Sequence, residues 1–178
     1  ESIKSHLRSL LSLLDHARNY PQLEDNYYEL FNLLHPCPIQ WGFGYEWERF
    51  IDHALTMDGS KHKQDRLLAD LAEIQFNTGN FSKAIQTCDK LISFSGAAID
   101  QLSRAVSIKI DSYRLMAHPE ISNKIFAQWS VDFHLDKPAS QVPQHFIEGW
   151  LRLKRYSLQS LRELGKVKQA LDVAHELV

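Results

Sequence analysis

The segment Leu68–Leu91 reads LADLAEIQFNTGNFSKAIQTCDKL, which is the pattern of two short amphipathic helices joined by a tight turn. Apolar residues recur at helical spacing on both sides of residues 77–80, where asparagine and glycine favour a turn. Two small residues, Ala72 and Ala84, fall where the two helices would touch. One helical hairpin cannot bury its apolar face alone, so the pattern predicts a stack of hairpins. Such a stack offers a binding surface but specifies no chemistry.

Apolar spacing predicts helices along the rest of the chain, and no alternating strand pattern lasts long enough to compete. Prolines and glycines stand at the joints, because proline cannot continue a helix. The expected helices cover residues 1–15, 23–34, 45–57, 65–77, 81–94, 97–117, 121–135, 144–164 and 167–178, with a loop at 136–143. About nine helices without a sheet predict an all-α protein.

The composition is that of a globular protein, because 178 residues can enclose a core and 44% of them are apolar. The formal net charge of −2 gives no general attraction to polyanions, so nucleic-acid binding would need a local basic patch. No apolar run approaches the ~18–20 residues of a membrane span, and no signal peptide is apparent. The sequence also lacks an initiator methionine. We therefore expect part of a longer, cytoplasmic protein that does not enter the membrane.

Residues 65–98 resemble one tetratricopeptide repeat, a helical hairpin of 34 residues. The residues at the family's motif positions are Leu68, Leu71, Ala72, Gln75, Gly79, Phe81, Ala84 and Cys88, with Gly96 in place of a proline. Three of them, Leu68, Gln75 and Cys88, replace aromatic residues of the family pattern. The resemblance implies an all-α, right-handed superhelix of stacked hairpins. It also implies a non-catalytic scaffold that binds a protein or peptide in a groove.

Other parts of the chain resemble degenerate copies of this repeat. Residues 151–178 match it with Gly165 in the turn, although Lys154 stands where an aromatic residue is expected. Residues around Trp47 fit the second helix of an earlier copy, with Gly42 in its turn. We expect a single domain over residues 1–178. It comprises a clear repeat at 65–98, degenerate hairpins at 1–38, 39–60 and 99–140, and a final repeat at 141–178.

A second resemblance concerns the length of the hairpins. Gly79 and Gly165 lie 86 positions apart, which suits two hairpins of about 43 residues better than the standard repeat length. Long, irregular hairpins of this kind resemble the sensor arrays of large signal-transduction ATPases, including bacterial transcription activators. The segment 33–50 also looks like a link between such hairpins. This resemblance implies, as an alternative function, a ligand-sensing regulatory domain, and no phosphate-binding glycine loop accompanies it.

In the tetratricopeptide family the first helix of each hairpin lines the groove. The corresponding residues are Arg66, Ala69, Asp70, Glu73, Phe76 and Asn77 in the clear repeat and Arg152, Arg155, Tyr156, Gln159 and Arg162 in the final one. The basic set also follows from spacing alone, because residues 152, 155, 159, 162 and 166 advance by three and four along one helix face. Guanidinium groups pair bidentately with carboxylates and phosphates, so this face could hold an acidic peptide or a phosphate.

The same face also has a simpler interpretation as a solvated surface, with Glu148 and Glu163 as partial neutralisers. If the groove exists, acidic Asp70 and Glu73 at one end and arginines at the other would grade its charge. A graded groove would favour an extended, polarised partner. One subgroup of the family clamps C-terminal carboxylates with lysine and asparagine. The matching positions here hold Ala69 and Glu73, which disfavours that mode.

Catalysis and metal binding find no support in the residue pattern. None of the nine histidines belongs to a zinc-hydrolase motif, so we expect no metal and no cofactor. Cys37 and Cys88 have apolar neighbours, which is typical of reduced core residues rather than nucleophiles. Most tryptophans fall at core spacing, and Trp41 is the exception because it lies in an expected loop. RNA binding through the basic helix remains a weaker alternative, as does a helical enzyme.

Overall fold

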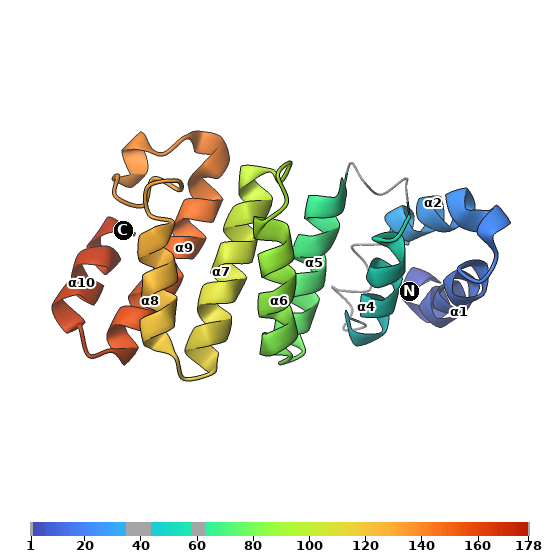
Figure 1. Ribbon diagram of the computed structural model, residues 1–178, viewed down its shortest axis with the longest axis horizontal. Coiled ribbons are helices and arrows are strands. Elements are labelled where there is room, and N and C mark those ends of the chain that lie inside the picture. Colours follow the sequence, from blue (N-terminus) through green and yellow to red (C-terminus); the bar gives the residue numbers. More distant parts are fainter. Residues whose placement is uncertain (1, 35–43, 58–62, 178) are drawn as a thin grey trace.

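The computed structural model describes residues 2–34, 44–57 and 63–177, and the described chain is all-helical, without a strand (Figure 1). Its nine α-helices are α1 (Ser2–Ala17), α2 (Glu24–Leu34), α4 (Gly44–Ala54), α5 (Gln64–Asn77), α6 (Phe81–Ile92), α7 (Ile99–Leu115), α8 (Pro119–Gln128), α9 (Ile147–Glu163) and α10 (Val167–Glu176). Short 3₁₀ turns occupy Pro21–Leu23, Ala139–Gln141 and Gln144–Phe146. The all-α prediction is therefore confirmed for these residues. Cys37, expected as a reduced core residue, and Trp41, expected in a loop, lie outside the described residues.

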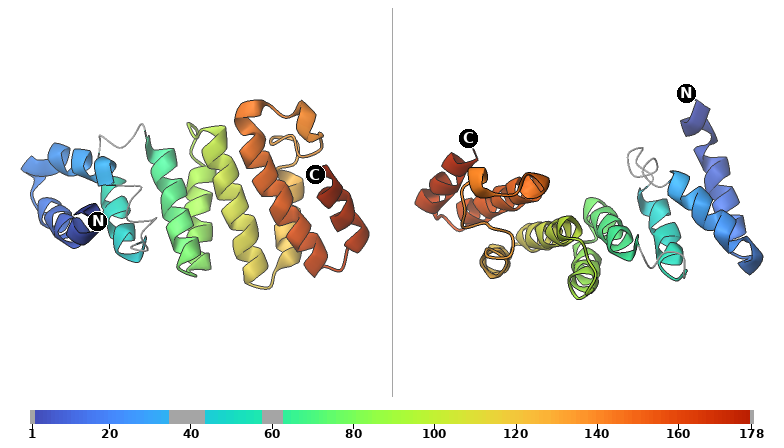
Figure 2. Two further views of the ribbon diagram at one scale, coloured as in Figure 1. Left: turned by 180° about the vertical axis from the view of Figure 1, so that it is seen from behind. Right: turned by 90° about the horizontal axis from the view of Figure 1, so that it is seen from above.

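Helices α5 to α10 form three consecutive hairpins, each made of two antiparallel helices in close contact. The first helices of these hairpins, α5, α7 and α9, stand side by side, and α7 packs against both of the others (Figure 2, left). Helices α6 and α8 lie on the other side of this row (Figure 2, right). One face of the molecule is therefore built from three first helices that run in the same direction.

The three hairpins turn by the same backbone geometry. The residues with positive φ are Gly79 at 78°, Ala117 at 64° and Gly165 at 70°. Each N–H of these residues donates to the carbonyl three positions back, and the next N–H donates five positions back. That pair of bonds is the Schellman motif, a common helix end, but here a helix follows at once in each case. A small residue five positions after the turn is buried each time, namely Ala84, Ser122 and Ala170.

The helix expected at 121–135 is shorter in the structure, because α8 ends at Gln128. The chain then makes a turn that closes with a bond from the Leu135 N–H to the Ser130 carbonyl, 2.7 Å long. His134 has a φ of 53° there, and its carbonyl accepts a bond from the Trp150 indole at 3.2 Å. Phe133 stacks on Phe146, with ring centroids 5.5 Å apart. Aromatic residues that have helical spacing in the sequence therefore pack in a turn, and this turn covers the N-terminal end of α9.

The core runs through the whole stack as three adjoining apolar clusters. Trp47 and Trp150 are fully buried in the N-terminal and C-terminal clusters, and Cys88 is fully buried in the central one. These core predictions are confirmed. Leu115 has the apolar spacing of a core residue but is 46% exposed, because it lies on the last turn of α7. No helix in the described segments is both long enough and apolar enough to span a bilayer.

Polar contacts fix the spacing between successive hairpins. The Asp65 carboxylate at the start of α5 accepts the Ala98 N–H at 3.0 Å and so caps the start of α7. Gln75 on α5 donates to Glu48 on α4 at 2.9 Å and accepts the Thr87 hydroxyl of α6 at 2.7 Å. These bonds hold α4, α5, α6 and α7 in fixed register, which is what positions the surface residues of the row.

Candidate functional site

A polar cleft of about 240 Å³ opens on the face built by the three first helices. Its lining residues are Glu73, Phe76 and Asn77 of α5, Arg104, Ser107 and Ile108 of α7, and Arg152, Arg155 and Tyr156 of α9. Figure 2 (left) shows the three helices that carry these residues side by side. Among the residues described, this cleft is where side chains from all three hairpins meet.

Arg104 joins α7 to α5 at one wall of the cleft. Its Nη2 lies 2.6 Å from Asp70 Oδ1 and 2.6 Å from Glu73 Oε2. Its Nη1 donates to Gln101 at 2.9 Å, which fixes the plane of the guanidinium. Burial by itself would lower the pKa of Arg104, but the two carboxylates outweigh it and raise that pKa. Arg66 lies 3.8 Å from the other oxygen of Asp70, so two basic and two acidic groups balance here.

Arg152 and Arg155 of α9 form the opposite wall and have no carboxylate within ion-pair distance among the described residues. The Arg155 guanidinium lies 5.5 Å from the centre of the Tyr156 ring, close enough for a cation–π contact. Glu163, an expected neutraliser, pairs with Arg114 of α7 at 2.6 Å instead. Glu148 lies near both arginines, but no ion pair joins it to either of them. Two guanidinium groups are thus presented to solvent together.

The structure brings together six of the eleven residues predicted for the groove, namely Glu73, Phe76, Asn77, Arg152, Arg155 and Tyr156. Arg66, Gln159 and Arg162 are on the expected helices but do not line the cleft. Asp70 is only 7% exposed and pairs with Arg104, so its carboxylate is engaged within the chain and does not line the cleft. Ala69 was also expected in the groove, but it is fully buried against the second helix of its hairpin.

Ion pairs within the chain change the charge balance that was expected along the groove. Asp70 and Glu73 do not present a negative end, because Arg104 and Arg66 together balance their two charges. The charge left over belongs to Arg152 and Arg155 alone. On α9, Leu151 is 41% exposed, whereas Trp150 and Leu153 are fully buried. The inward face of α9 therefore includes Trp150 and Leu153 but not Leu151.

The α7 contribution to the cleft was not foreseen, because the turn after α7 contains no glycine. With Ala117 aligned to Gly79 and Gly165, Arg104 falls at the position of Arg66 in α5 and Arg152 in α9. Ser107 likewise corresponds to Arg155. The signal available in the sequence was therefore the arginine recurring at the same distance before each turn. This recurrence can be recognised only if Ala117 is treated as a turn residue with positive φ, equivalent to Gly79 and Gly165.

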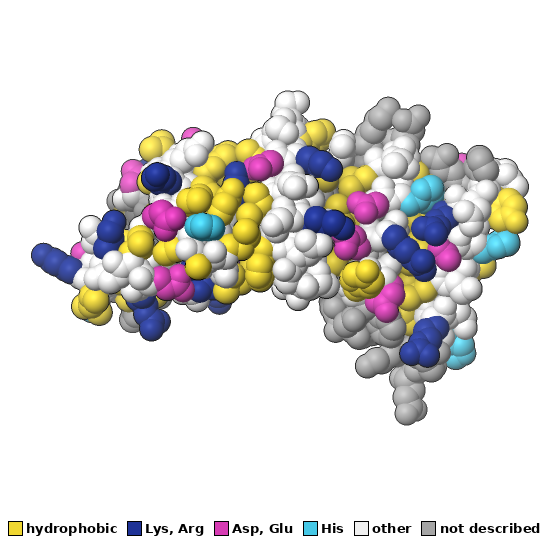
Figure 3. All heavy atoms as spheres, turned by 60° about the horizontal axis from the view of Figure 1, so that its bottom comes forward, with side chains coloured by type: hydrophobic (Ala, Val, Ile, Leu, Met, Phe, Trp, Pro, Cys, Tyr) yellow, Lys and Arg dark blue, Asp and Glu magenta, His cyan; other side chains and the backbone are white. Residues whose placement is uncertain are grey.

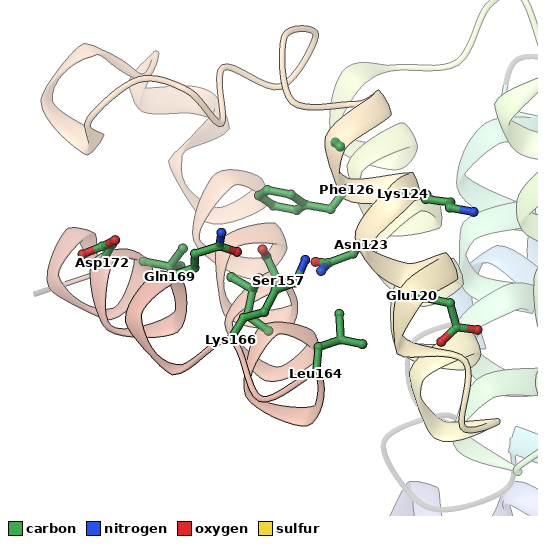
Figure 4. A pocket seen from close by; sticks show the side chains of 12 residues that line it. Glu120, Asn123, Lys124, Phe126, Ser157, Leu164, Lys166, Gln169 and Asp172 are labelled. Carbon is green, nitrogen blue, oxygen red and sulfur yellow. The ribbon is translucent and has the colours of Figure 1, made fainter.

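A second hollow, of about 670 Å³, lies between α8, α9 and α10 (Figure 4). Phe126 of α8 and Leu164 after α9 line it together with Val173 of α10, and charged side chains such as Glu120 and Lys166 stand at its edges. Figure 3 shows hydrophobic side chains gathered over α7 and α8, with basic and acidic groups interspersed rather than clustered. The lining of this hollow is therefore mostly apolar, and it also includes the polar side chains of Asn123, Ser157 and Gln169.

Neither metal chemistry nor thiol chemistry gains a site in the described residues. No group of three histidine, cysteine, aspartate or glutamate side chains is placed there to hold a metal ion. Burial raises the pKa of the Cys88 thiol to about 12, so the thiolate is not the form present at neutral pH.

In comparisons with known proteins, no family model, no curated protein and no solved structure matches this chain significantly. The residues that line the cleft are therefore the main indication of what this chain binds.

Proposed function

We propose that this chain is a non-catalytic interaction module of the tetratricopeptide type, a right-handed superhelix that binds a peptide segment of a partner protein across α5, α7 and α9. Three consecutive hairpins with one turn geometry support this reading, because stacked repeats create extended surfaces from equivalent helices. The single observation that carries the proposal is the cleft in which all three first helices contribute polar side chains.

The cleft has the properties expected of a peptide-binding surface. Arg104 is held by two carboxylates and Arg155 lies against an aromatic ring, so both side chains are ordered before a ligand arrives. Such preorganisation reduces the entropy lost on binding. Arginine and tyrosine are also the residue types that dominate binding hot spots. No group in the cleft is placed to act as nucleophile and base together, which favours recognition over catalysis.

The test is selection of ligands from a random peptide library displayed on phage, followed by calorimetry with the selected peptides. The variant Arg152→Glu/Arg155→Glu should lose binding while its far-UV circular dichroism stays unchanged. A matched control is Lys137→Glu/Lys168→Glu, which makes the same change in net charge at exposed positions outside the cleft. If the selected peptides bind the cleft variant as well as the parent, or if no peptide is selected, the proposal fails.

The sensor-domain alternative finds its support in the hollow between α8, α9 and α10, whose size falls in the range of small-molecule sites. Such sites enclose most of their ligand, whereas this hollow is open to solvent along α8 and α10 (Figure 4). Stabilisation of the chain by a small apolar ligand in a thermal-shift screen, lost in Phe126→Asp, would favour this alternative. Without that result, the peptide-binding cleft is the better-supported function.

A further inference from the structure

The arginine that recurs in each first helix has a different environment each time. Arg66, Arg104 and Arg152 stand thirteen residues before the left-handed turn residue of their hairpins, that is, before Gly79, Ala117 and Gly165. Arg104 of the middle hairpin reaches back to α5, where Asp70 and Glu73 accept its hydrogen bonds at 2.6 Å each. Arg152 occupies the same place one hairpin later, so its equivalent acceptors would lie on α7.

Those acceptors are missing on α7. The counterpart of Asp70 is Ile108, an apolar residue that is 9% exposed and lines the cleft. The counterpart of Glu73 is Asp111, which is 6% exposed and pairs with Arg114 at 2.6 Å. Arg152 is therefore an arginine whose internal partner is absent within the described chain, in a repeat where the neighbouring arginine has two. Arg155, three residues further along α9, corresponds to Ser107 rather than to an arginine, and it too has no carboxylate within ion-pair distance among the described residues.

We infer that Arg152 and Arg155 receive two carboxylate side chains from an acidic segment of the partner peptide. This inference rests on the proposed function and specifies the chemistry of its ligand. Residues three apart on a helix have neighbouring but separate side chains, so each guanidinium can take its own carboxylate bidentately. The partner's carboxylates thereby take the place that Asp70 and Glu73 fill for Arg104.

The surroundings of the two arginines suit an acidic peptide. The Asn77 amide and the Tyr156 hydroxyl line the same cleft and can bond to a peptide backbone. The Ser107 hydroxyl is fully buried and donates to the Ser103 carbonyl at 2.6 Å, so it fixes this part of the cleft wall. Glu73 is held by Arg104 and does not compete for Arg152. The cleft therefore offers charge for two carboxylates and neutral bonding groups between them.

The first experiment measures fluorescence anisotropy of labelled, C-terminally amidated peptides of glycine, serine and alanine with a central Glu-Glu, Glu-Gln or Gln-Gln pair. Each carboxylate lost should weaken binding about tenfold, in line with a charge-assisted bidentate contact. The affinity for Glu-Glu should fall as salt rises, because both guanidinium groups are partly or fully exposed. A phosphoserine peptide or a neutral peptide with a free C-terminal carboxylate should bind more weakly than Glu-Glu.

The second experiment supplies the missing internal partner. Ile108→Asp places a carboxylate on α7 where α5 has Asp70, so Arg152 should pair with it and Glu-Glu binding should drop about tenfold or more. Ile108→Asn is the matched control, because it introduces similar size and polarity without the charge. Binding by Ile108→Asn should stay within about threefold of the parent. Circular dichroism and urea unfolding establish that both variants are folded.

The outcomes separate this inference from the proposed function. If selected peptides bind the cleft but Gln-Gln binds as well as Glu-Glu, the carboxylate inference is overturned and the peptide-binding function stands. The same holds if phosphoserine or a free C-terminus binds more tightly than Glu-Glu, or if Ile108→Asp and Ile108→Asn behave alike. If neither the designed peptides nor any displayed peptide binds the cleft, both the inference and the proposed function are wrong.

Discussion

The Arg104 guanidinium on α7 lies 2.6 Å from the Asp70 carboxylate on α5, and this contact joins the first helices of two successive hairpins. The Asp70 side chain is 10% exposed and that of Arg104 is 21% exposed, so water screens the pair only partly. Removing one member of such a pair leaves the other charge under-compensated, which usually costs more than the pair itself contributes. The contact thus links the register of the two hairpins to the shape of the cleft.

We expect Asp70→Asn to lower the free energy of unfolding by about 2 kcal/mol, measured by urea titration. The expected loss is smaller than for an isolated buried pair, because Glu73 remains 2.6 Å from Arg104. Asp89→Asn is the control, since Asp89 pairs with Lys109 at 2.5 Å but its side chain is 52% exposed. That change should cost no more than about 1 kcal/mol. Equal losses at the two sites would contradict the role given to Arg104.

The sequence predicted the hairpin of α5 and α6 within two residues at each end, because apolar periodicity and Gly79 agree there. It failed at the turn after α7, where Ala117 adopts a conformation that glycine usually takes. It also failed at the end of α8, where Trp129 and Phe133 continue a helical spacing without a helix. In both places tertiary packing outweighs the local conformational preference of the residues. Such packing cannot be predicted from the helix propensity of a single residue.

We expect Ala117→Gly to raise the free energy of unfolding by about 1 kcal/mol and Gly165→Ala to lower it by a similar amount. Both positions have positive φ, 64° and 70°, and a Cβ is strained in that region. Ala127→Gly, at an exposed position in the last turn of α8, should instead lower stability by up to about 1 kcal/mol, because glycine is a poorer helix former than alanine. Destabilisation by Ala117→Gly would show that the three turns are not equivalent.

The site was predictable to the extent that the turn glycines were. Gly79 and Gly165 set the register of α5 and α9, and that register placed Glu73 and Arg152 correctly on the cleft surface. The burial of Asp70 was not predictable, because it depends on Arg104 reaching across from a helix whose register lacked a glycine marker. The charged residues of the site could be identified from the sequence. The ion pairs that cancel some of these charges could be identified only from the structure.

A close approach between α7 and α9 gives a third prediction. A Cβ on Gly149 would lie 2.7 Å from the Ser103 hydroxyl and 2.7 Å from the Phe146 ring. Gly149→Ala should therefore force the two helices apart and lower the free energy of unfolding by about 1–3 kcal/mol. Because α7 and α9 carry opposite walls of the cleft, affinity for the selected peptides should fall as well.

Gly96→Ala is the matched control for this prediction, since a Cβ there would make an ordinary contact of 3.5 Å with the Phe94 ring. Its effect on stability should stay within about 0.5 kcal/mol. If Gly149→Ala is as harmless as Gly96→Ala in urea unfolding, the close packing of α7 on α9 through Ser103 is wrong.

The buried thiol of Cys88 makes stability depend on alkaline pH. Burial raises the pKa of Cys88 from 9.0 to about 12 in the folded chain, so between these values the unfolded chain loses a proton that the folded chain keeps. The contribution of Cys88 to the free energy of unfolding is complete below pH 9 and is lost as pH rises toward 12, at up to about 1.4 kcal/mol per pH unit.

Cys88→Ala removes the ionisation but leaves all other titrating groups in place. The parent should therefore lose more stability than Cys88→Ala between pH 8 and about pH 10 in urea titrations. Parallel pH profiles for the two proteins would mean that Cys88 ionises as readily in the folded chain as in the unfolded one, and would contradict its burial at the α5–α6–α7 contact.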